Sequence, residues 1–93
     1  MRAKRTDSNQ TEIVKALRKC GYSVFVTSMV GHGFPDILVG AHGKNYIFEL
    51  KDGKKPKSQQ KLTDMETLFH LSWQGTVHIV TSVDEAIDIV SKH

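Results

Sequence analysis

The sequence predicts a small α/β protein with a mixed central sheet flanked by helices. Three observations indicate this class: apolar residues at helical spacing near the start, two strand-like apolar segments in the middle, and a Ser-x-x-Glu helix start at 82–85. The segments follow the order α-β-β-β-α-β-α, which favours a layered α/β arrangement on so short a chain. With 93 residues, the chain is expected to form one domain, 1–93, with a thin core, because a chain of this size buries only about 60 to 65% of its unfolded surface.

The first predicted helix is capped by Ser8 or Asn9, runs to about Lys19 and stops at Gly21. Its apolar stripe consists of Ile13, Ala16, Leu17 and Cys20. The segment 22–27 is rich in aromatic and β-branched residues and therefore indicates the first strand.

A predicted hairpin follows, in which the loop 40–45 joins two apolar strands. Counting outward from this loop places Asp36 opposite Glu49, and directly opposed residues have Cβ atoms about 4.5 to 5.5 Å apart. Because side chains alternate between the two faces of a strand, Lys51 lies on the same face as both carboxylates. Like charges opposed in this way repel each other unless a cation neutralises them. The hairpin therefore predicts a cation site.

A second helix is predicted to begin at Lys57 or Ser58 and to be followed by a strand over 76–80. The expected buried side of this helix consists of Leu62, Met65, Leu68 and Phe69. Ser82 and Glu85 have the spacing of a capping box, which starts the last helix.

The opposed carboxylates suit a hard divalent cation, Mg²⁺ or Mn²⁺, which prefers oxygen ligands. The main-chain carbonyl of Leu50 adds a third oxygen, and Glu12, at the edge of the first helix's apolar stripe, approaches as an outer acid through water. Such an ion activates water and stabilises charge on a phosphoryl group, while Lys51 bonds the water or the phosphate. The alternative is that Asp36 is a turn residue and that Glu12, Glu49 and Lys51 are ordinary surface residues.

Basic residues gather on both sides of the predicted site. Lys54, Lys55, Lys57 and Lys61 follow the second strand of the hairpin, and residues 1–7 form a basic arm. Together with the net charge of +3, they favour a polyanionic partner, which would bind with sequence-independent affinity that falls with salt. The alternative for the four lysines is a solvated loop.

The single cysteine, Cys20, excludes an intrachain disulfide and fits a reducing compartment; its place on the apolar stripe predicts a buried thiol. No run approaches the roughly 20 apolar residues of a membrane span, and the polar start carries no apolar signal core. We therefore expect the chain to stay inside the cell.

Two motifs resemble a known nuclease family. Gly33-Phe34-Pro35-Asp36 followed by Glu49-Leu50-Lys51 resembles the PD-(D/E)XK nuclease signature. The longer pattern, which continues through Gln59-Gln60-Lys61-Leu62 to the segments 77–80 and 82–86, resembles a VRR-NUC domain over nearly the whole chain.

The resemblance implies a divalent-metal-dependent nuclease with a restriction-endonuclease-like αβββαβ core and a C-terminal helix. It implies that Asp36 and Glu49 are metal ligands, that Lys51 is the catalytic lysine, and that Glu12 and Gln60 are the acid and the glutamine of the family's two helices. Stand-alone members this short resemble phage or bacterial homodimers that act on branched DNA such as four-way (Holliday) junctions. The implied location is the cytoplasm of a bacterium or of a phage-infected host cell.

Two other functional classes stay open: a nucleic-acid-binding module without catalysis, and a metal-dependent hydrolase of small phosphoesters. Dimerisation also has a physical motive that is independent of the resemblance. A thin core gains stability when apolar surface is buried on a partner.

Overall fold

The computed structural model describes residues 9–92, which form three α-helices, four strands and one 3₁₀ helix. In chain order these are α1 (Gln10–Lys19), β1 (Ser23–Val26), β2 (Ile37–Ala41), β3 (Lys44–Leu50), η1 (Lys57–Gln59), α2 (Asp64–Ser72), β4 (Val77–Val80) and α3 (Val83–Ser91). The strands lie in the order β1-β2-β3-β4; the first three are antiparallel, and β4 pairs with β3 in parallel. The predicted α/β class with a mixed sheet is therefore confirmed.

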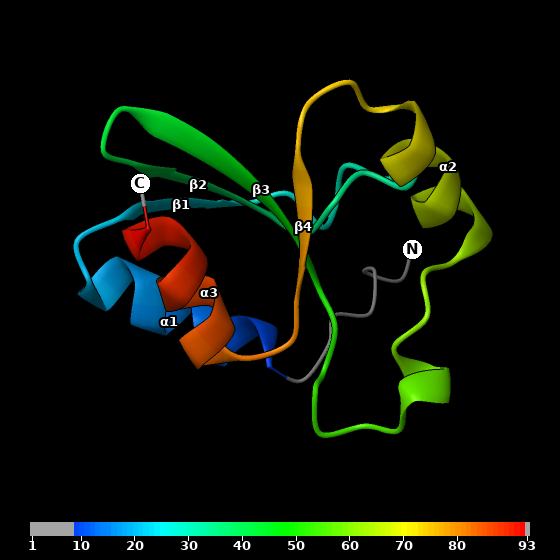
Figure 1. Ribbon diagram of the computed structural model, residues 1–93, viewed down its shortest axis with the longest axis horizontal. Helices are drawn as coiled ribbons and strands as arrows, with labels where there is room; N and C mark the ends of the chain where they lie inside the picture. The colour runs from blue at the N-terminus through cyan, green and yellow to red at the C-terminus, as the bar shows by residue number, and fades with distance from the viewer. Residues whose placement is uncertain (1–8, 93) are drawn as a thin grey trace.

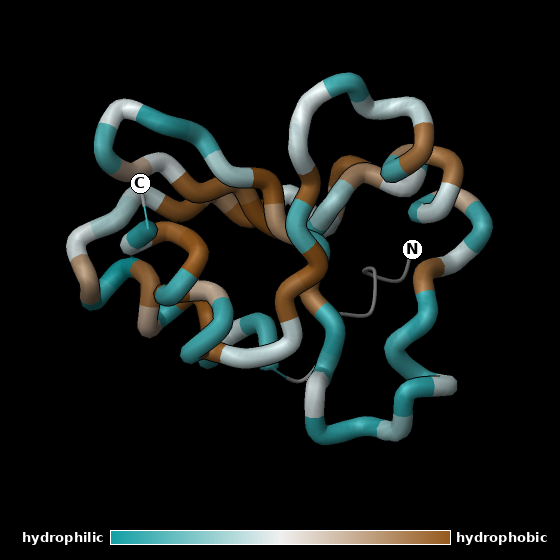
Figure 2. Tube along the Cα trace, viewed as in Figure 1, coloured by the Kyte–Doolittle hydropathy of each residue, from teal (hydrophilic) through white to brown (hydrophobic). Residues whose placement is uncertain are grey.

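Helices α1 and α3 together cover one face of the sheet (Figure 1). Alternate residues of β2 and β3 point into this layer, and residues at helical spacing meet them from α1 and α3. The buried core consists of Ile13, Val14, Leu17, Ile37, Val39, Phe48, Leu50, Val80, Ala86 and Val90. Figure 2 shows hydrophobic (brown) stretches along the central strands and along α1 and α3. Asp36, Glu49 and Lys51 therefore belong to the opposite face of the sheet.

The hairpin of β2 and β3 has the predicted register but a shorter loop. Val39 pairs with Tyr46, and two further residue pairs extend the strands into the predicted loop 40–45. The turn itself consists of His42 and Gly43, whose φ values are 57° and 73°. Positive φ at both central residues is what a two-residue type I′ turn requires. The predicted loop is too long by equal amounts at both ends, so the pairing of the strands is unchanged.

The second helix is shorter than predicted, and it turns a different side inward. The 3₁₀ helix η1 takes the place of its expected start, and α2 begins after Thr63 in a capping box that Thr63 and Glu66 form with each other. The expected buried residues Met65 and Leu68 are 50% and 62% exposed, whereas Glu66 is buried. Phe69 is half-buried. The prediction is wrong for Met65 and Leu68, because the polar side of α2 makes the contacts with the sheet.

The starts of α1 and α3 join the helical layer to the ends of the strands. Asn9 occupies the capping position of α1 but makes no capping bond; its Nδ2 donates to the carbonyls of Lys51 at 3.0 Å and Thr81 at 3.2 Å. The Ser82 hydroxyl caps α3 as predicted, since it accepts from the Glu85 amide at 3.1 Å. The Glu85 carboxylate in turn accepts from the Thr81 amide at 2.6 Å, one residue earlier than an ordinary capping box.

Three further expectations concern the thiol of Cys20, the basic residues 1–7 and membrane-spanning segments. Cys20 is exposed, because it follows the last turn of α1, so the expected buried thiol is wrong. The predicted basic arm, residues 1–7, lies outside the described residues. Between residues 9 and 92, no helix has the length and apolar character needed to cross a membrane.

Candidate functional site

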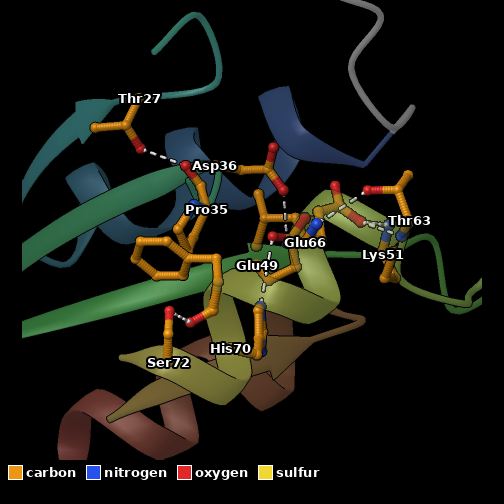
Figure 3. Close-up of polar contacts among 11 residues, drawn as sticks. Thr27, Pro35, Asp36, Glu49, Lys51, Thr63, Glu66, His70 and Ser72 are labelled. Carbon is orange, nitrogen blue, oxygen red and sulfur yellow. Dashed lines mark hydrogen bonds and ion pairs between the residues drawn. The ribbon is translucent and has the colours of Figure 1, made fainter. Parts of the chain in front are cut away.

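The carboxyl groups of Asp36 and Glu49 lie together where the hairpin opens (Figure 3). The pairing of β2 with β3 ends at Ile37 and Phe48, and the Asp36 amide donates to the Phe48 carbonyl at 2.9 Å, which places Asp36 at the open end of the hairpin. Asp36 and Glu49 are only 7% and 1% exposed, and their side chains are hydrogen-bonded to each other. Two acidic groups are therefore held together away from water.

Asp36 also binds the backbone of β3. Its Oδ2 accepts from the Leu50 amide at 2.8 Å, whereas the next amide, that of Lys51, donates to β4. Because the amide and the carbonyl of one strand residue point to the same side of the strand, the Leu50 carbonyl faces the side on which Asp36 lies. The three oxygen ligands expected from the sequence thus belong to one corner of the sheet.

Lys51 is paired with an acid of α2. Its Nζ lies 3.0 Å from Oε1 of Glu66, and the same oxygen accepts from the Thr63 amide at 2.9 Å. The side chains of Lys51 and Glu66 are 11% and 9% exposed. Glu66 was not among the residues expected at the site, although the Thr-x-x-Glu spacing from Thr63 is itself a helix-start signal that marks this residue. We refer to Asp36, Glu49, Lys51 and Glu66 as the charged cluster.

His70 approaches the charged cluster from the same side of α2. It follows Glu66 by four residues, and its Nε2 lies 3.7 Å from Oε1 of Glu49, which is too far for a hydrogen bond. Both atoms are buried, and neither has a hydrogen-bond partner. Burial lowers the pKa of His70 in spite of the opposing charge of Glu66. His70 was not among the residues expected at the site, because only the fold brings it to Glu49.

The two glutamates of the charged cluster have opposite electrostatic surroundings. Burial raises the pKa of Glu49 to about 9, and both the hydrogen bond and the charge of Asp36 act in the same direction, as does the charge of Glu66. Burial also acts to raise the pKa of Glu66, but the Thr63 amide and the Lys51 ammonium outweigh it, so that pKa is lowered. Glu66 is therefore a carboxylate at neutral pH and Glu49 an acid. A cation bound beside Glu49 would favour its ionised form.

Two predicted site residues lie apart from the charged cluster. Glu12 is exposed on α1 and lines a cavity of about 520 Å³ with Asp52 and Lys54; no member of the charged cluster lines this cavity. Gln60 follows η1, and its Nε2 donates to the Lys55 carbonyl at 2.6 Å. The structure thus brings Asp36, Glu49 and Lys51 together and places Glu12 and Gln60 elsewhere.

The four predicted DNA-binding lysines lie in the segment between β3 and α2. Lys54, Lys55, Lys57 and Lys61 are all exposed. This segment leads directly from Lys51 into the helix that carries Glu66. A polyanion bound along it would lie next to the charged cluster.

The carboxylate oxygens of Asp36 and Glu49 suit a divalent ion that takes only one or two of its ligands from the protein and the rest from water. Among residues 9–92, no three or more His, Cys, Asp or Glu side chains are arranged to hold a metal ion. Mg²⁺, however, usually keeps several waters beside one or two protein carboxylates. Asp36 and Glu49 provide that number, and the buried Oε1 of Glu49 has no hydrogen-bond partner to give up. The residues therefore fit a hydrated hard cation.

Comparison of the chain with protein-family models, with curated proteins and with solved structures finds no match. The resemblance to VRR-NUC nucleases thus depends on the sequence motifs alone.

Proposed function

We propose that this protein is a divalent-metal-dependent endonuclease that hydrolyses DNA phosphodiester bonds, with a preference for branched DNA such as four-way junctions. The observation that supports this most is the hydrogen-bonded pair of buried carboxyl groups, Asp36 and Glu49, with the charge of Lys51 acting on Glu49. The order of the elements is compatible with a restriction-endonuclease-like αβββαβ core of the VRR-NUC type, which the proposal includes. The preference for branched DNA comes from the sequence resemblance, as does the location in a bacterial or phage-infected cell.

Asp36, Glu49 and the Leu50 carbonyl would hold Mg²⁺ or Mn²⁺. The bound ion would lower the pKa of a water molecule and offset charge on the phosphoryl oxygens. Lys51 would donate a hydrogen bond to the phosphate or to the attacking water. Glu66 orients Lys51, because its carboxylate is itself fixed by the Thr63 amide.

Access to the charged cluster requires a movement of α2. Glu49 and Lys51 are 1% and 9% exposed, since Glu66 and His70 lie over them. Glu66 is the buried residue of α2, so the Lys51–Glu66 ion pair is the main polar contact that has to open. The lysine-rich segment continues directly into α2, and DNA bound there is placed to displace the helix.

The exposed lysines would hold the DNA backbone. Lys54, Lys55, Lys57 and Lys61 would neutralise successive phosphates and provide affinity without base recognition. Gln60 lies among these lysines, and its bond to the Lys55 carbonyl shapes the segment. We therefore assign Gln60 to this path, whereas Glu12 stays a predicted outer acid.

A nucleic-acid-binding module without catalysis is the second candidate. The Lys51–Glu66 ion pair favours it, because the pair gives Lys51 a structural role that needs no metal ion. In that case the lysine-rich segment would bind nucleic acid, and the charged cluster would only hold α2 in place.

Cleavage of labelled four-way junction, flap and linear duplex in Mg²⁺ or Mn²⁺ separates these candidates. We expect Asp36→Asn and Glu49→Gln to lower cleavage by on the order of 100-fold or more, whereas Asp88→Asn, on the exposed side of α3, serves as the control and cleaves normally. Cleavage that survives both substitutions would contradict the metal site. Binding without cleavage of any substrate would favour the binding module, and turnover of a mononucleotide analogue in the presence of competitor DNA would favour a small-phosphoester hydrolase.

A further inference from the structure

His70 and Glu49 face each other across a short gap that no hydrogen bond closes (Figure 3). Nε2 of His70 lies 3.7 Å from Oε1 of Glu49, and among the described residues neither atom has a hydrogen-bond partner. The hydrogen bond between Glu49 and Asp36 therefore uses the other carboxyl oxygen, Oε2. Buried polar atoms are normally paired, so two unpaired atoms that face each other need an explanation.

The width of the gap favours a metal ion over a water molecule. Both atoms are buried from solvent, and a bridging water needs a cavity of its own size with polar partners around it. An ion needs less room, because Zn²⁺ binds imidazole nitrogen and carboxylate oxygen at about 2.0 to 2.2 Å. Two ligands of one ion at these bond lengths lie roughly 3 to 4 Å apart. The separation of 3.7 Å between Nε2 and Oε1 falls within this range.

We propose that Zn²⁺, or another divalent ion that accepts imidazole, binds between Glu49 and His70 and fixes α2 to the sheet. The imidazole selects the ion, because it suits zinc, nickel and copper, whereas carboxylate and water suit magnesium. The protein supplies two ligands, and water can complete the coordination on the side where the His70 side chain is 15% exposed. A divalent ion also offsets the excess of carboxyl over ammonium groups in the charged cluster.

The ion would connect two elements that lie far apart in the sequence. Glu49 belongs to β3, and His70 lies in the last turn of α2. The Lys51–Glu66 ion pair joins the same part of the sheet to the same helix, and Glu66 precedes His70 by one helical turn. A metal bond at His70 therefore adds a second point at which the inner side of α2 is held.

The effect of this ion on cleavage rests on the proposed nuclease function, which requires α2 to move. Mg²⁺ would take oxygen ligands from Asp36 and Glu49 and leave His70 unbound, so α2 could still be displaced by DNA. Zn²⁺ would bind His70 as well and keep α2 over Glu49 and Lys51. Zn²⁺ would therefore hold the charged cluster closed, whereas Mg²⁺ would permit it to open.

Calorimetric titration of Zn²⁺ into the full chain tests the site without DNA. A Cys20→Ser background removes the exposed thiol, which could bind Zn²⁺ itself. We expect His70→Gln to weaken Zn²⁺ binding at least about 10-fold and to change Mg²⁺ binding by no more than about twofold. Equal Zn²⁺ affinity with and without His70, or no Zn²⁺ binding at all at submillimolar concentration, would overturn the proposal.

The matched control removes a histidine outside the charged cluster. His42→Asn changes an exposed residue of the hairpin turn, and Asn before Gly43 suits a type I′ turn. We expect its Zn²⁺ affinity to equal that of the parent chain, and circular dichroism verifies that both variants fold. A loss as large as that of His70→Gln would mean that Zn²⁺ binds histidines without regard to the gap, which contradicts the proposal.

Hydrogen exchange of the Cys20→Ser chain, without any change at His70, tests whether the ion fixes α2. We expect Zn²⁺ to slow amide exchange in Asp64–Ser72 at least about 10-fold more than in α3, which covers the other face of the sheet, whereas Mg²⁺ has no such selective effect. Zn²⁺ binding without slower exchange in α2 would contradict the proposal. Both measurements omit DNA, so a chain that binds Zn²⁺ in this way but cleaves no DNA would refute the nuclease and support the metal site.

Discussion

Replacing Glu49 with glutamine should stabilise the metal-free protein, and the gain should grow with pH. The pKa of Glu49 is raised from 4.5 to about 9 in the folded protein, first by burial and then by Asp36 and Glu66. Between these two pH values, the folded state binds more protons than the unfolded state, so stability falls as pH rises. Glutamine resembles the protonated acid and does not titrate. The Glu49→Gln variant therefore escapes this loss.

The size of the effect follows from the shift in pKa. Each pH unit within the window from about 4.5 to 9 changes the difference in unfolding free energy by about 1.4 kcal/mol. Near pH 4 the difference should vanish, and at pH 7 it should reach about 3 kcal/mol in favour of the variant. Lys51 and His70 border the same group, so the titration belongs to the cluster as a whole.

Urea unfolding in EDTA from pH 4 to pH 9 measures this difference. Glu12→Gln is the control, because Glu12 is exposed on α1 and lies outside the charged cluster. A gain for Glu49→Gln that is constant over the whole range would refute burial of an ionisable Glu49 as its cause. Addition of Mg²⁺ at pH 8 should stabilise the wild type selectively, since a bound cation favours the ionised carboxyl.

Three further predictions concern DNA and α2. Lys51→Ala should abolish cleavage while DNA affinity, measured by fluorescence anisotropy, changes by only a small factor; a large loss of binding would make Lys51 a DNA contact. The double substitution Lys54→Ala and Lys55→Ala should reduce the slope of log affinity against log salt by about 1 to 2, and an unchanged slope would place the DNA elsewhere. Gly33→Ala should destabilise the protein by about 2 kcal/mol or more in urea unfolding, because Gly33 has a φ of +78° and a Cβ there would collide with the Met65 carbonyl. A neutral effect would mean that α2 does not rest on this loop.

The hairpin register could be predicted from the sequence because it depends only on the centre of the turn. The loop assumed over 40–45 is too long, yet it has the same centre as the actual turn at His42 and Gly43. The pairing itself ends at Ile37 and Phe48, but the expected contact between the Asp36 and Glu49 side chains is present. Alternation along the strands then fixes which side chains share a face.

The orientation of α2 could not be predicted in the same way. Helical periodicity identifies Met65 and Leu68 as an apolar stripe, but it does not say what covers that stripe. The opposite side of the helix is turned inward, where Glu66 meets Lys51 at 3.0 Å. That contact joins residues fifteen positions apart, and no local pattern reports it. Gln60 was expected at the site because the VRR-NUC resemblance implies a glutamine at the start of the second helix, and η1 takes that place.

Calorimetric titration of Mn²⁺ into the wild type and the Asp36→Asn variant at pH 8 tests most directly whether the charged cluster binds a divalent cation. We expect the wild type to bind Mn²⁺ with release of the proton held by Glu49, and the variant to lose this binding. Equal binding by both proteins, or no binding by the wild type at millimolar Mn²⁺, would contradict the proposed site.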